Sequence, residues 1–313
     1  MAYQSIVVGT DGTASSLLAV RKAATIAQRT SAQLTLVVAF HNRNSSLRGD
    51  PNTRPEDLPY VPYELADRIV DRAVATATEQ GIVAPETQKR LGDPVDVLLD
   101  VIRTQNADLL VSGNKGIRTL SGRVFGAIPT EVTRRALVDV LLVNTSTALS
   151  DVPRDSSRYG TILVGTDGTS SALLAVQRAA ALAVNFNAQL VIATAYQKKA
   201  SALRPDWLHK PGNKAMVFQE DVETILEQAR TTAAGEGDAE VLLVSREGEP
   251  ADVLLQLATD HDVDLVVSGN KGVRSFSGRV FGNIPTEIVR RSEIDVLLVD
   301  TSSSQTLESG SGS

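Results

Sequence analysis

The chain has 313 residues, of which 42% are hydrophobic and 22% are charged, and its formal net charge is −6. This length suits two domains of about 150 residues each. The negative charge argues against nucleic acid or an anionic membrane as a partner, because such binding rests on many Lys and Arg contacts. The absence of cysteine excludes disulfides, thiolate nucleophiles and Cys-based metal sites.

The sequence carries no recognisable targeting or membrane signal. Its N-terminus lacks a basic region followed by a long apolar stretch, and no apolar run approaches the ~18 residues that span a bilayer. We therefore expect a cytoplasmic protein.

In chain order, short β-branched apolar runs alternate with longer segments of helical periodicity, the pattern of βαβ units and a parallel sheet. In the first half we predict strands near 4–9, 34–40, 86–91, 107–112 and 139–144, and helices near 14–29, 61–80, 94–105 and 127–136. Thr13 and Ser15 are candidate caps of the first helix. Gly92-Asp93-Pro94 places a capping carboxylate before a proline, and Gly248-Glu249-Pro250 repeats that arrangement.

The second half repeats the first. SIVVGTDGT (5–13) recurs as TILVGTDGT (161–169), and the segment 108–143 recurs as 264–299, in both cases 156 residues later. Such a period indicates one structural unit written twice. The polar stretch SDVPRDSSRYG between the copies suits a linker.

We therefore predict domains at 1–148 and 159–301, joined by a linker at 149–158. A flexible tail is expected at 302–313, and its ending LESGSGS is typical of an added expression tail. Two segments that differ between the halves, 41–60 and 197–220, are predicted to be surface loops.

A glycine-rich loop follows the fourth strand of each half, Gly113-x2-Gly116-x9-Gly126 and Gly269-x2-Gly272-x9-Gly282. Glycines let backbone N–H groups approach an anion, and the helix start after each loop offers unpaired N–H donors to a phosphate. The alternative is a set of turn and packing glycines. The identity of SGNK and SGRVFG in both halves favours phosphate binding. Nearby positive charges are Lys115, Arg118 and Arg123, repeated as Lys271, Arg274 and Arg279.

An aspartate ends the first strand of each half, Asp11 and Asp167. At the carboxyl edge of a parallel sheet, such a carboxylate can accept hydrogen bonds from ribose hydroxyls or an adenine amine. The competing interpretation is a helix-capping Asp in a Thr-Asp-Gly turn, and both roles can coexist. Ala39 and Ala195 end the second strand, where a small side chain leaves the backbone free to meet an adenine edge.

These residues resemble the universal stress protein family, in particular members with two such domains in one chain. The family's nucleotide-binding signature is G-x2-G-x9-G-(S/T) before the last helix, with an Asp at the end of the first strand. The resemblance covers 3–145 and 159–301. It implies two tandem Rossmann-like (adenine nucleotide alpha hydrolase-like) α/β domains, each a five-stranded parallel sheet of order 3-2-1-4-5 between helices.

The resemblance also implies a site for ATP or another adenine nucleotide in each domain, with Mg²⁺ possible alongside ATP. In the first domain the matching residues are Gly9, Thr10, Asp11, Ala39, Gly113, Asn114, Lys115, Gly116, Arg123, Gly126, Ala127 and Ile128. In the second domain they are Gly165, Thr166, Asp167, Ala195, Gly269, Asn270, Lys271, Gly272, Arg279, Gly282, Asn283 and Ile284.

The chain departs from the signature at its last position, where Ala127 and Asn283 replace the expected Ser or Thr. Ala127 offers only its backbone, whereas the Asn283 amide can still donate. Loss of one hydrogen bond to a charged group costs about 1.5–3 kcal/mol, enough to weaken triphosphate binding. We therefore expect AMP or cyclic AMP to compete with ATP, and the two sites to differ.

Other chemistries find less support. No Gly-Lys-Ser/Thr follows the glycines, so the loop is not a P-loop. His41, His209 and His261 have no second ligand at metal spacing, and no metal site or catalytic residue is predicted.

We expect an adenine-nucleotide-binding stress sensor or regulator without efficient catalysis. The alternatives are a slow ATPase or self-phosphorylating protein, and a non-binding structural pseudo-dimer. In the related family the last strand forms the dimer contact, which two fused domains can make internally; a homodimer and an unidentified protein partner are also compatible with the sequence.

Overall fold

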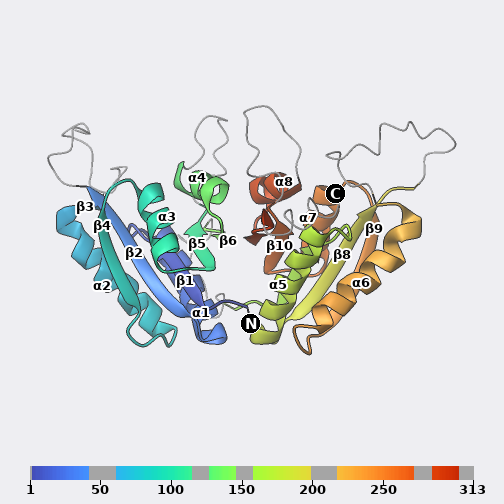
Figure 1. Cartoon of the computed structure of the whole chain (residues 1–313), viewed down its shortest axis with the longest axis horizontal. Helices are drawn as coiled ribbons and strands as arrows, with labels where there is room; N and C mark the ends of the chain where they lie inside the picture. The colour runs from blue at the N-terminus through green and yellow to red at the C-terminus, as the bar shows by residue number, and fades with distance from the viewer. Residues whose placement is uncertain are drawn as a thin grey trace, which may run out of the picture. The chain divides into compact units, whose positions relative to one another are not determined.

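The computed structural model describes residues 2–41, 61–114, 127–145, 158–198, 217–270 and 284–302. The chain divides into two compact units (Figure 1). Of the described residues, the first unit comprises those up to Arg158 together with Asp295–Asp300, and the second comprises those from Tyr159 to Ile294 together with Thr301 and Ser302. The domain limits 1–148 and 159–301 stay a prediction.

Strands and helices alternate along the first repeat, as the apolar pattern predicts. They are β1 (Ser5–Gly9), α1 (Ala14–Thr30), β2 (Gln33–His41), β3 (Val61–Pro62), α2 (Tyr63–Glu79), β4 (Glu86–Leu91), α3 (Pro94–Thr104), β5 (Leu109–Gly113), α4 (Ala127–Arg135) and β6 (Asp139–Val143). Parallel pairing gives the order β4-β2-β1-β5-β6, which confirms the predicted order 3-2-1-4-5.

The second repeat has the same organisation. Its elements are β7 (Thr161–Gly165), α5 (Ser170–Phe186), β8 (Gln189–Tyr196), the 3₁₀-helix η4 (Gln219–Asp221), α6 (Val222–Ala234), β9 (Val241–Glu247), α7 (Pro250–Asp260), β10 (Leu265–Gly269), α8 (Ile284–Arg291) and β11 (Asp295–Val299). The strand order is β9-β8-β7-β10-β11.

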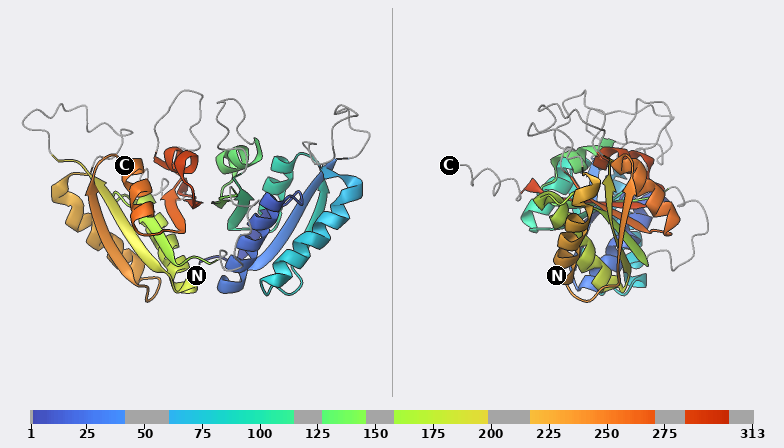
Figure 2. Two further views of the ribbon diagram at one scale, coloured as in Figure 1. Left: turned by 180° about the vertical axis from the view of Figure 1, so that it is seen from behind. Right: turned by 90° about the vertical axis from the view of Figure 1, so that its right-hand side faces the viewer.

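Helices cover both faces of each sheet (Figure 2). Helix α1 packs against α2, and α3 packs against α4; α5 with α6 and α7 with α8 repeat the arrangement. The central strands β1, β5, β7 and β10 are therefore almost wholly buried at their apolar residues, as expected for a parallel sheet covered on both sides. The outer strand β4 alternates between half-buried and exposed residues, because one face meets solvent.

Helix starts follow local capping chemistry. Thr13 caps α1, and its hydroxyl accepts a hydrogen bond from the Ser16 N–H at 3.3 Å. Ser15 lies inside the helix, so it is not the cap. Asp93 caps α3 and accepts from the Val95 and Asp96 N–H groups at 2.9 and 3.3 Å. The predicted equivalent at Glu249 is wrong in detail, because its side chain makes no cap hydrogen bond and instead accepts from Gln197 at 3.1 Å.

The predicted helix at 61–80 is corrected at its start, because residues 61 and 62 form the short strand β3 and pair with β2. Of the predicted surface loops, 42–60 and 199–216 lie outside the described residues. In the described part of the chain, no helix is long and apolar enough to cross a membrane.

Candidate functional site

The carboxyl end of β1 turns tightly beneath α3. A Cβ on Gly9 would lie 3.1 Å from Leu98 Cδ2, and a Cβ on Gly165 would lie 2.7 Å from Leu254 Cδ1. At both positions a side chain would press on this leucine, so packing of the strand end against α3 or α7 favours glycine. Each glycine also brings the next three residues to the carboxyl edge of the sheet.

The turn after β1 is fixed by a small hydrogen-bond network. Gly12 has φ +79°, a left-handed conformation that favours glycine. Its N–H donates to Thr10 Oγ1 at 3.1 Å. Asp11 Oδ1 accepts from the Thr13 N–H at 3.0 Å and from the Thr13 hydroxyl at 2.7 Å. The Asp11 side chain is thus held in one orientation while the residue stays exposed.

The second repeat reproduces this turn. Gly168 has φ +78° and donates to Thr166 Oγ1 at 3.2 Å. Asp167 Oδ1 accepts from the Thr169 N–H and hydroxyl at 3.1 and 2.6 Å. Each Asp therefore braces the cap residue of the following helix, Thr13 or Thr169, and is not itself the cap.

The first aspartate is stabilised in its charged form. Loss of surrounding water favours the neutral acid, but hydrogen bonds from Ser16, from Thr13 and from the backbone outweigh it. The pKa of Asp11 therefore lies below its ordinary value of 3.8. Asp11 presents a carboxylate to solvent at neutral pH, as an acceptor for ligand hydroxyls or amines.

The end of β2 lies beside this turn. The Thr10 N–H donates to Val37 O at 2.9 Å, and Ala39 follows two residues later, half-buried. The second repeat has the same contact, from the Thr166 N–H to Ala193 O at 2.9 Å. The structure therefore brings together the predicted residues of the first two strands in each repeat.

The end of β5 is built by packing as well as by loop geometry. A Cβ on Gly113 would lie 3.1 Å from Thr145 Cγ2 and 3.4 Å from Ser15 O. Asn114 Oδ1 accepts from the Thr145 N–H at 3.0 Å and hydroxyl at 3.1 Å. Gly113 is thus in close contact with Thr145 and does not have a positive φ, and Asn114 joins the ends of β5 and β6.

The second repeat makes the same contacts at the end of β10. Asn270 Oδ1 accepts from the Thr301 N–H and hydroxyl, both at 3.1 Å. A Cβ on Gly269 would lie 3.2 Å from Thr301 Cγ2. The first residues of both glycine-rich loops are therefore anchored to the strand beside them.

Most of each loop lies outside the described residues. This applies to Lys115, Gly116, Arg118, Arg123 and Gly126, and to Lys271, Gly272, Arg274, Arg279, Gly282 and Asn283. Helix α4 begins at Ala127, as predicted, and α8 begins at Ile284. Ile128 and Ile284 are half-buried in the first turns of these helices.

Comparison with known proteins identifies both repeats. The family model described as the universal stress protein family matches residues 2–144 and again residues 158–300. The chain belongs to the universal stress protein family. Universal stress protein Rv1636 of Mycobacterium tuberculosis strain H37Rv is 37% identical over 145 residues, which are 46% of this chain and 99% of that protein.

Solved structures match both repeats together. A universal stress protein from Archaeoglobus fulgidus aligns with a TM-score of 0.65 and 16% identity, over 96% of each chain. Protein PA1789 of Pseudomonas aeruginosa PAO1, described as functionally unknown, aligns with a TM-score of 0.61 and 18% identity, over 100% of this chain and 98% of that one. These likenesses confirm the tandem α/β fold.

Some residues of the turn were not among the predicted site residues of this universal stress protein. They are Gly12, Thr13 and Ser16, with Gly168 and Thr169 in the second repeat. The Thr-Asp-Gly-Thr sequence holds the signal for most of them, since Asp often accepts from the backbone two residues on. Thr145 and Thr301 could not be found from local sequence, because each is 31 residues from its Asn partner.

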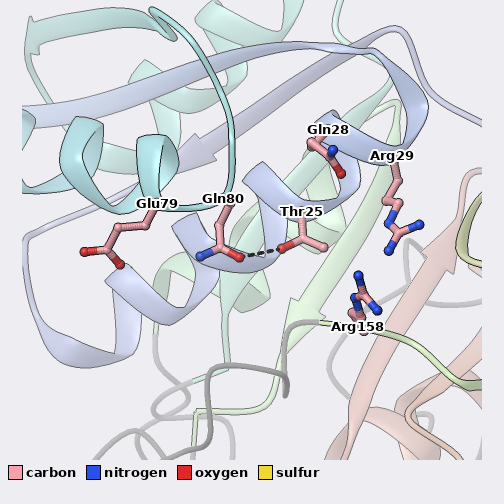
Figure 3. Close-up of a pocket in the computed structure, with 6 residues that line it drawn as sticks. All are labelled: Thr25, Gln28, Arg29, Glu79, Gln80 and Arg158. Atoms are coloured by element: carbon pink, nitrogen blue, oxygen red, sulfur yellow. Dashed lines mark hydrogen bonds between the residues drawn. The ribbon is translucent and has the colours of Figure 1, made fainter.

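A separate hollow of about 240 Å³ lies in the first unit, away from the turn. Figure 3 shows Arg29 and Arg158 on one side, and Thr25 donating to Gln80 Oε1 at 3.3 Å. Arg29 is in the last turn of the 17-residue α1, about 25 Å from the cap at Thr13. This hollow therefore takes no part in the candidate site. Among the described residues, no group of acidic or His side chains could hold a metal.

Proposed function

We propose that this universal stress protein binds an adenine nucleotide at each repeat and acts as a sensor or regulator without efficient catalysis. The observation that carries the proposal is the duplicated turn after β1 and β7. In each, a braced carboxylate lies at the carboxyl edge of a parallel sheet, near the alanine in the last residues of β2 or β8. This edge is where open α/β sheets bind ligands.

Two observations support the proposal that the glycine-rich loops bind the nucleotide phosphates: the position of the strand before each loop and the charge of the loop sequence. The strand that precedes each glycine-rich loop ends at Gly113 or Gly269, on the same sheet edge as the Asp turn. Lys115, Arg123 and their equivalents give the loop positive charge. An adenosine held at the turn would therefore direct its phosphates toward a cationic, glycine-rich segment and the start of α4 or α8.

The choice of nucleotide follows from the last loop position. Because Ala127 and Asn283 lack the hydroxyl of the family signature, we propose that AMP and cyclic AMP compete with ATP, with Mg²⁺ accompanying ATP only. Titration calorimetry of the full chain with ATP, AMP and cyclic AMP tests this. Two equal sites with a large preference for ATP would contradict it.

Matched variants test the role of the turn. Asp11→Ala should weaken binding in the first repeat, and Asp167→Ala should weaken binding in the second. Each single variant is expected to lose about half of the high-affinity stoichiometry, and the double variant all of it. Unchanged binding by the double variant would remove the carboxylates from the site.

The catalytic alternative is slow ATP hydrolysis or self-phosphorylation. It gains support only from carboxylates near the proposed phosphate path, because no base or metal ligand can be named among the described residues. Release of phosphate from ATP and Mg²⁺, abolished by the Asp11→Ala, Asp167→Ala double variant, would establish it.

The scaffold alternative is a chain that has lost ligand binding, and Ala127 is the residue that favours it. Mass spectrometry of small molecules released from freshly purified protein distinguishes this scaffold from a nucleotide-binding sensor. An adenine nucleotide in the extract supports the sensor. An empty extract, followed by calorimetry without heat from any adenine nucleotide, would favour the scaffold.

Domain limits and assembly are part of the same proposal. We place the domains at 1–148 and 159–301, and expect the two repeats to pair within one chain as a pseudo-dimer. Sedimentation of the full chain as a monomer, together with dimers of the separately expressed 1–148 fragment, would support intramolecular pairing. A full-length chain that sediments only as a dimer would contradict it.

A further inference from the structure

Two of the substitutions between the repeats change a hydroxyl that contacts the threonine opening the turn after β1 or β7. Ser16 of the first repeat corresponds to Ala172 of the second, and Val38 corresponds to Thr194. Each repeat therefore has one extra hydroxyl beside the threonine that opens the turn, but the hydroxyl comes from a different element. In the first repeat it belongs to α1, and in the second it belongs to β8.

In the first repeat the extra hydroxyl engages the Thr10 side chain. Ser16 Oγ lies 2.9 Å from Thr10 Oγ1 and donates to Thr13 O at 3.1 Å. Either hydroxyl can be the donor in the contact between Thr10 and Ser16; where Ser16 donates its one hydrogen to Thr13 O, Thr10 donates to Ser16. In that arrangement the Thr10 hydroxyl hydrogen is occupied, whereas the Thr10 carbonyl oxygen has no donor among the described residues.

In the second repeat the pattern is inverted. Thr194 Oγ1 donates to the carbonyl oxygen of Thr166, in a short buried hydrogen bond. Ala172 has no hydroxyl, so the Thr166 hydroxyl only accepts, from the Gly168 N–H at 3.2 Å. Within the described part of the chain, its hydrogen finds no acceptor.

Both threonines lie where a ligand base is expected. Each donates its N–H to the second strand two residues before Ala39 or Ala195, and each is only 7% exposed. A polar group left without a partner at such a buried position costs free energy, and a ligand that supplies the partner recovers it. The open group is a carbonyl acceptor in the first repeat and a hydroxyl donor in the second.

We propose that the two sites recognise the edge of a purine base with opposite polarity, an inference that rests on the nucleotide-binding function proposed above. The Thr10 carbonyl accepts from a 6-amino group, so the first site selects adenine. The Thr166 hydroxyl donates to an acceptor atom, so the second site also takes a 6-oxo purine such as hypoxanthine. Ser16, Val38, Ala172 and Thr194 set this difference without being the contacting groups.

The test compares AMP with IMP, which differ in carrying an amino group or an oxygen at position 6. Calorimetry on Asp167→Ala measures the first site, and calorimetry on Asp11→Ala measures the second. The ratio of the IMP to the AMP dissociation constant should be about two- to tenfold larger at the first site, the effect of one net hydrogen bond. Backbone amide signals of Ala39 and Ala195 follow the two sites separately in the unmutated chain.

Crossed double variants provide the matched control. Ser16→Ala with Val38→Thr should give the first site the ratio of the second, and Ala172→Ser with Thr194→Val should do the reverse. Equal ratios at both sites, unchanged in the crossed variants, would overturn this inference while leaving nucleotide binding intact. Absence of any AMP, IMP or ATP binding to the unmutated chain would overturn the proposed function, and this inference with it.

Discussion

Thr35 carries a buried hydroxyl that finds no hydrogen-bond partner among the described residues. The residue lies within β2, is 1% exposed, and corresponds to Val191 in β8. Thr35→Val should raise the free energy of unfolding by about 1 kcal/mol, because it removes an unpaired polar atom without changing the shape of the side chain. Urea unfolding of the two proteins measures the difference.

The second repeat supplies the control for Thr35. Val191→Thr places a hydroxyl in the equivalent apolar position and should lower the free energy of unfolding by a similar amount. A destabilised Thr35→Val variant would instead mean that the hydroxyl has a partner in solution.

Ser16 is expected to control the ionisation of Asp11. Its hydrogen bond is one of the contacts that lower the pKa of Asp11. Ser16→Ala should therefore move that pKa upward, toward 3.8, as followed by the carboxyl ¹³C shift. Because the pKa is lower in the folded chain, the charged carboxylate stabilises folding above pH 3.8, and this contribution disappears as the pH falls through the folded value.

A comparison of the free energies of unfolding of the unmutated chain and Ser16→Ala at low pH provides a further test. Where Asp11 is protonated in both proteins, the stability difference due to its charge should vanish. A pKa unchanged by Ser16→Ala would show that Thr13 and the backbone alone hold the carboxylate.

At the scale of single residues, sequence predicted where the residues of the candidate site lie in the fold better than it predicted their contacts. Gly9, Thr10 and Asp11 were proposed as site residues because they close or follow an apolar strand that is repeated in the chain, and their role in binding stays a prediction. The close packing at Gly113 was not predicted, because the atoms nearest to a Cβ there belong to Thr145 and Ser15, which are distant in sequence. In sequence, Asp11 and Asn114 are both polar residues that come just after an apolar strand. Only the structure shows that Asp11 is exposed to solvent, whereas the Asn114 side chain is bound to Thr145.

Among the helices, α3 and α7 offer a matched pair of N-termini. Asp93 accepts from two N–H groups of α3, whereas Glu249 makes no such bond to α7. Asp93→Ala should lower the free energy of unfolding by about 1 kcal/mol, the usual loss for an N-cap. Thermal or urea unfolding measures it.

Glu249→Ala is the corresponding control. It removes an exposed contact with Gln197 and no cap hydrogen bond to α7, so its effect should be well below that of Asp93→Ala. Equal losses in the two variants would mean that α3 does not depend on its cap.

The fold itself was largely predictable at the scale of elements, and its exceptions have local causes. Apolar runs such as those of β1 and β5 indicate strands, because both faces are buried. Strand β3 has only two residues, too few to show a period, and was assigned to the following helix. The cap at Glu249 was mistaken because Glu is one methylene longer than Asp and its carboxylate reaches Gln197 instead of the helix N-terminus.

For the whole molecule, duplication is the feature that gives the strongest inference. The turn network, the Gly packing and the Asn anchor each appear twice with nearly equal distances, although α1 and α5 differ in many residues. Because the two repeats share these contacts, a residue that differs between them can be linked to a difference between the two sites. Ser16 against Ala172 and Val38 against Thr194 are such differences, and they fall at the proposed base position.

Nucleotide binding to the folded chain must also appear as added stability. A ligand present at one hundred times its dissociation constant stabilises a site by about 2.7 kcal/mol, provided that it does not bind the unfolded chain. Saturating AMP should therefore raise the midpoint of thermal unfolding. In Asp11→Ala the added increment should fall, and in the Asp11→Ala, Asp167→Ala double variant it should disappear, each compared with the same variant without ligand. An increment of stability that survives in the double variant would show that AMP binds elsewhere. The hollow lined by Thr25, Arg29 and Arg158 would then be the first place to examine, because its two guanidinium groups suit a phosphate.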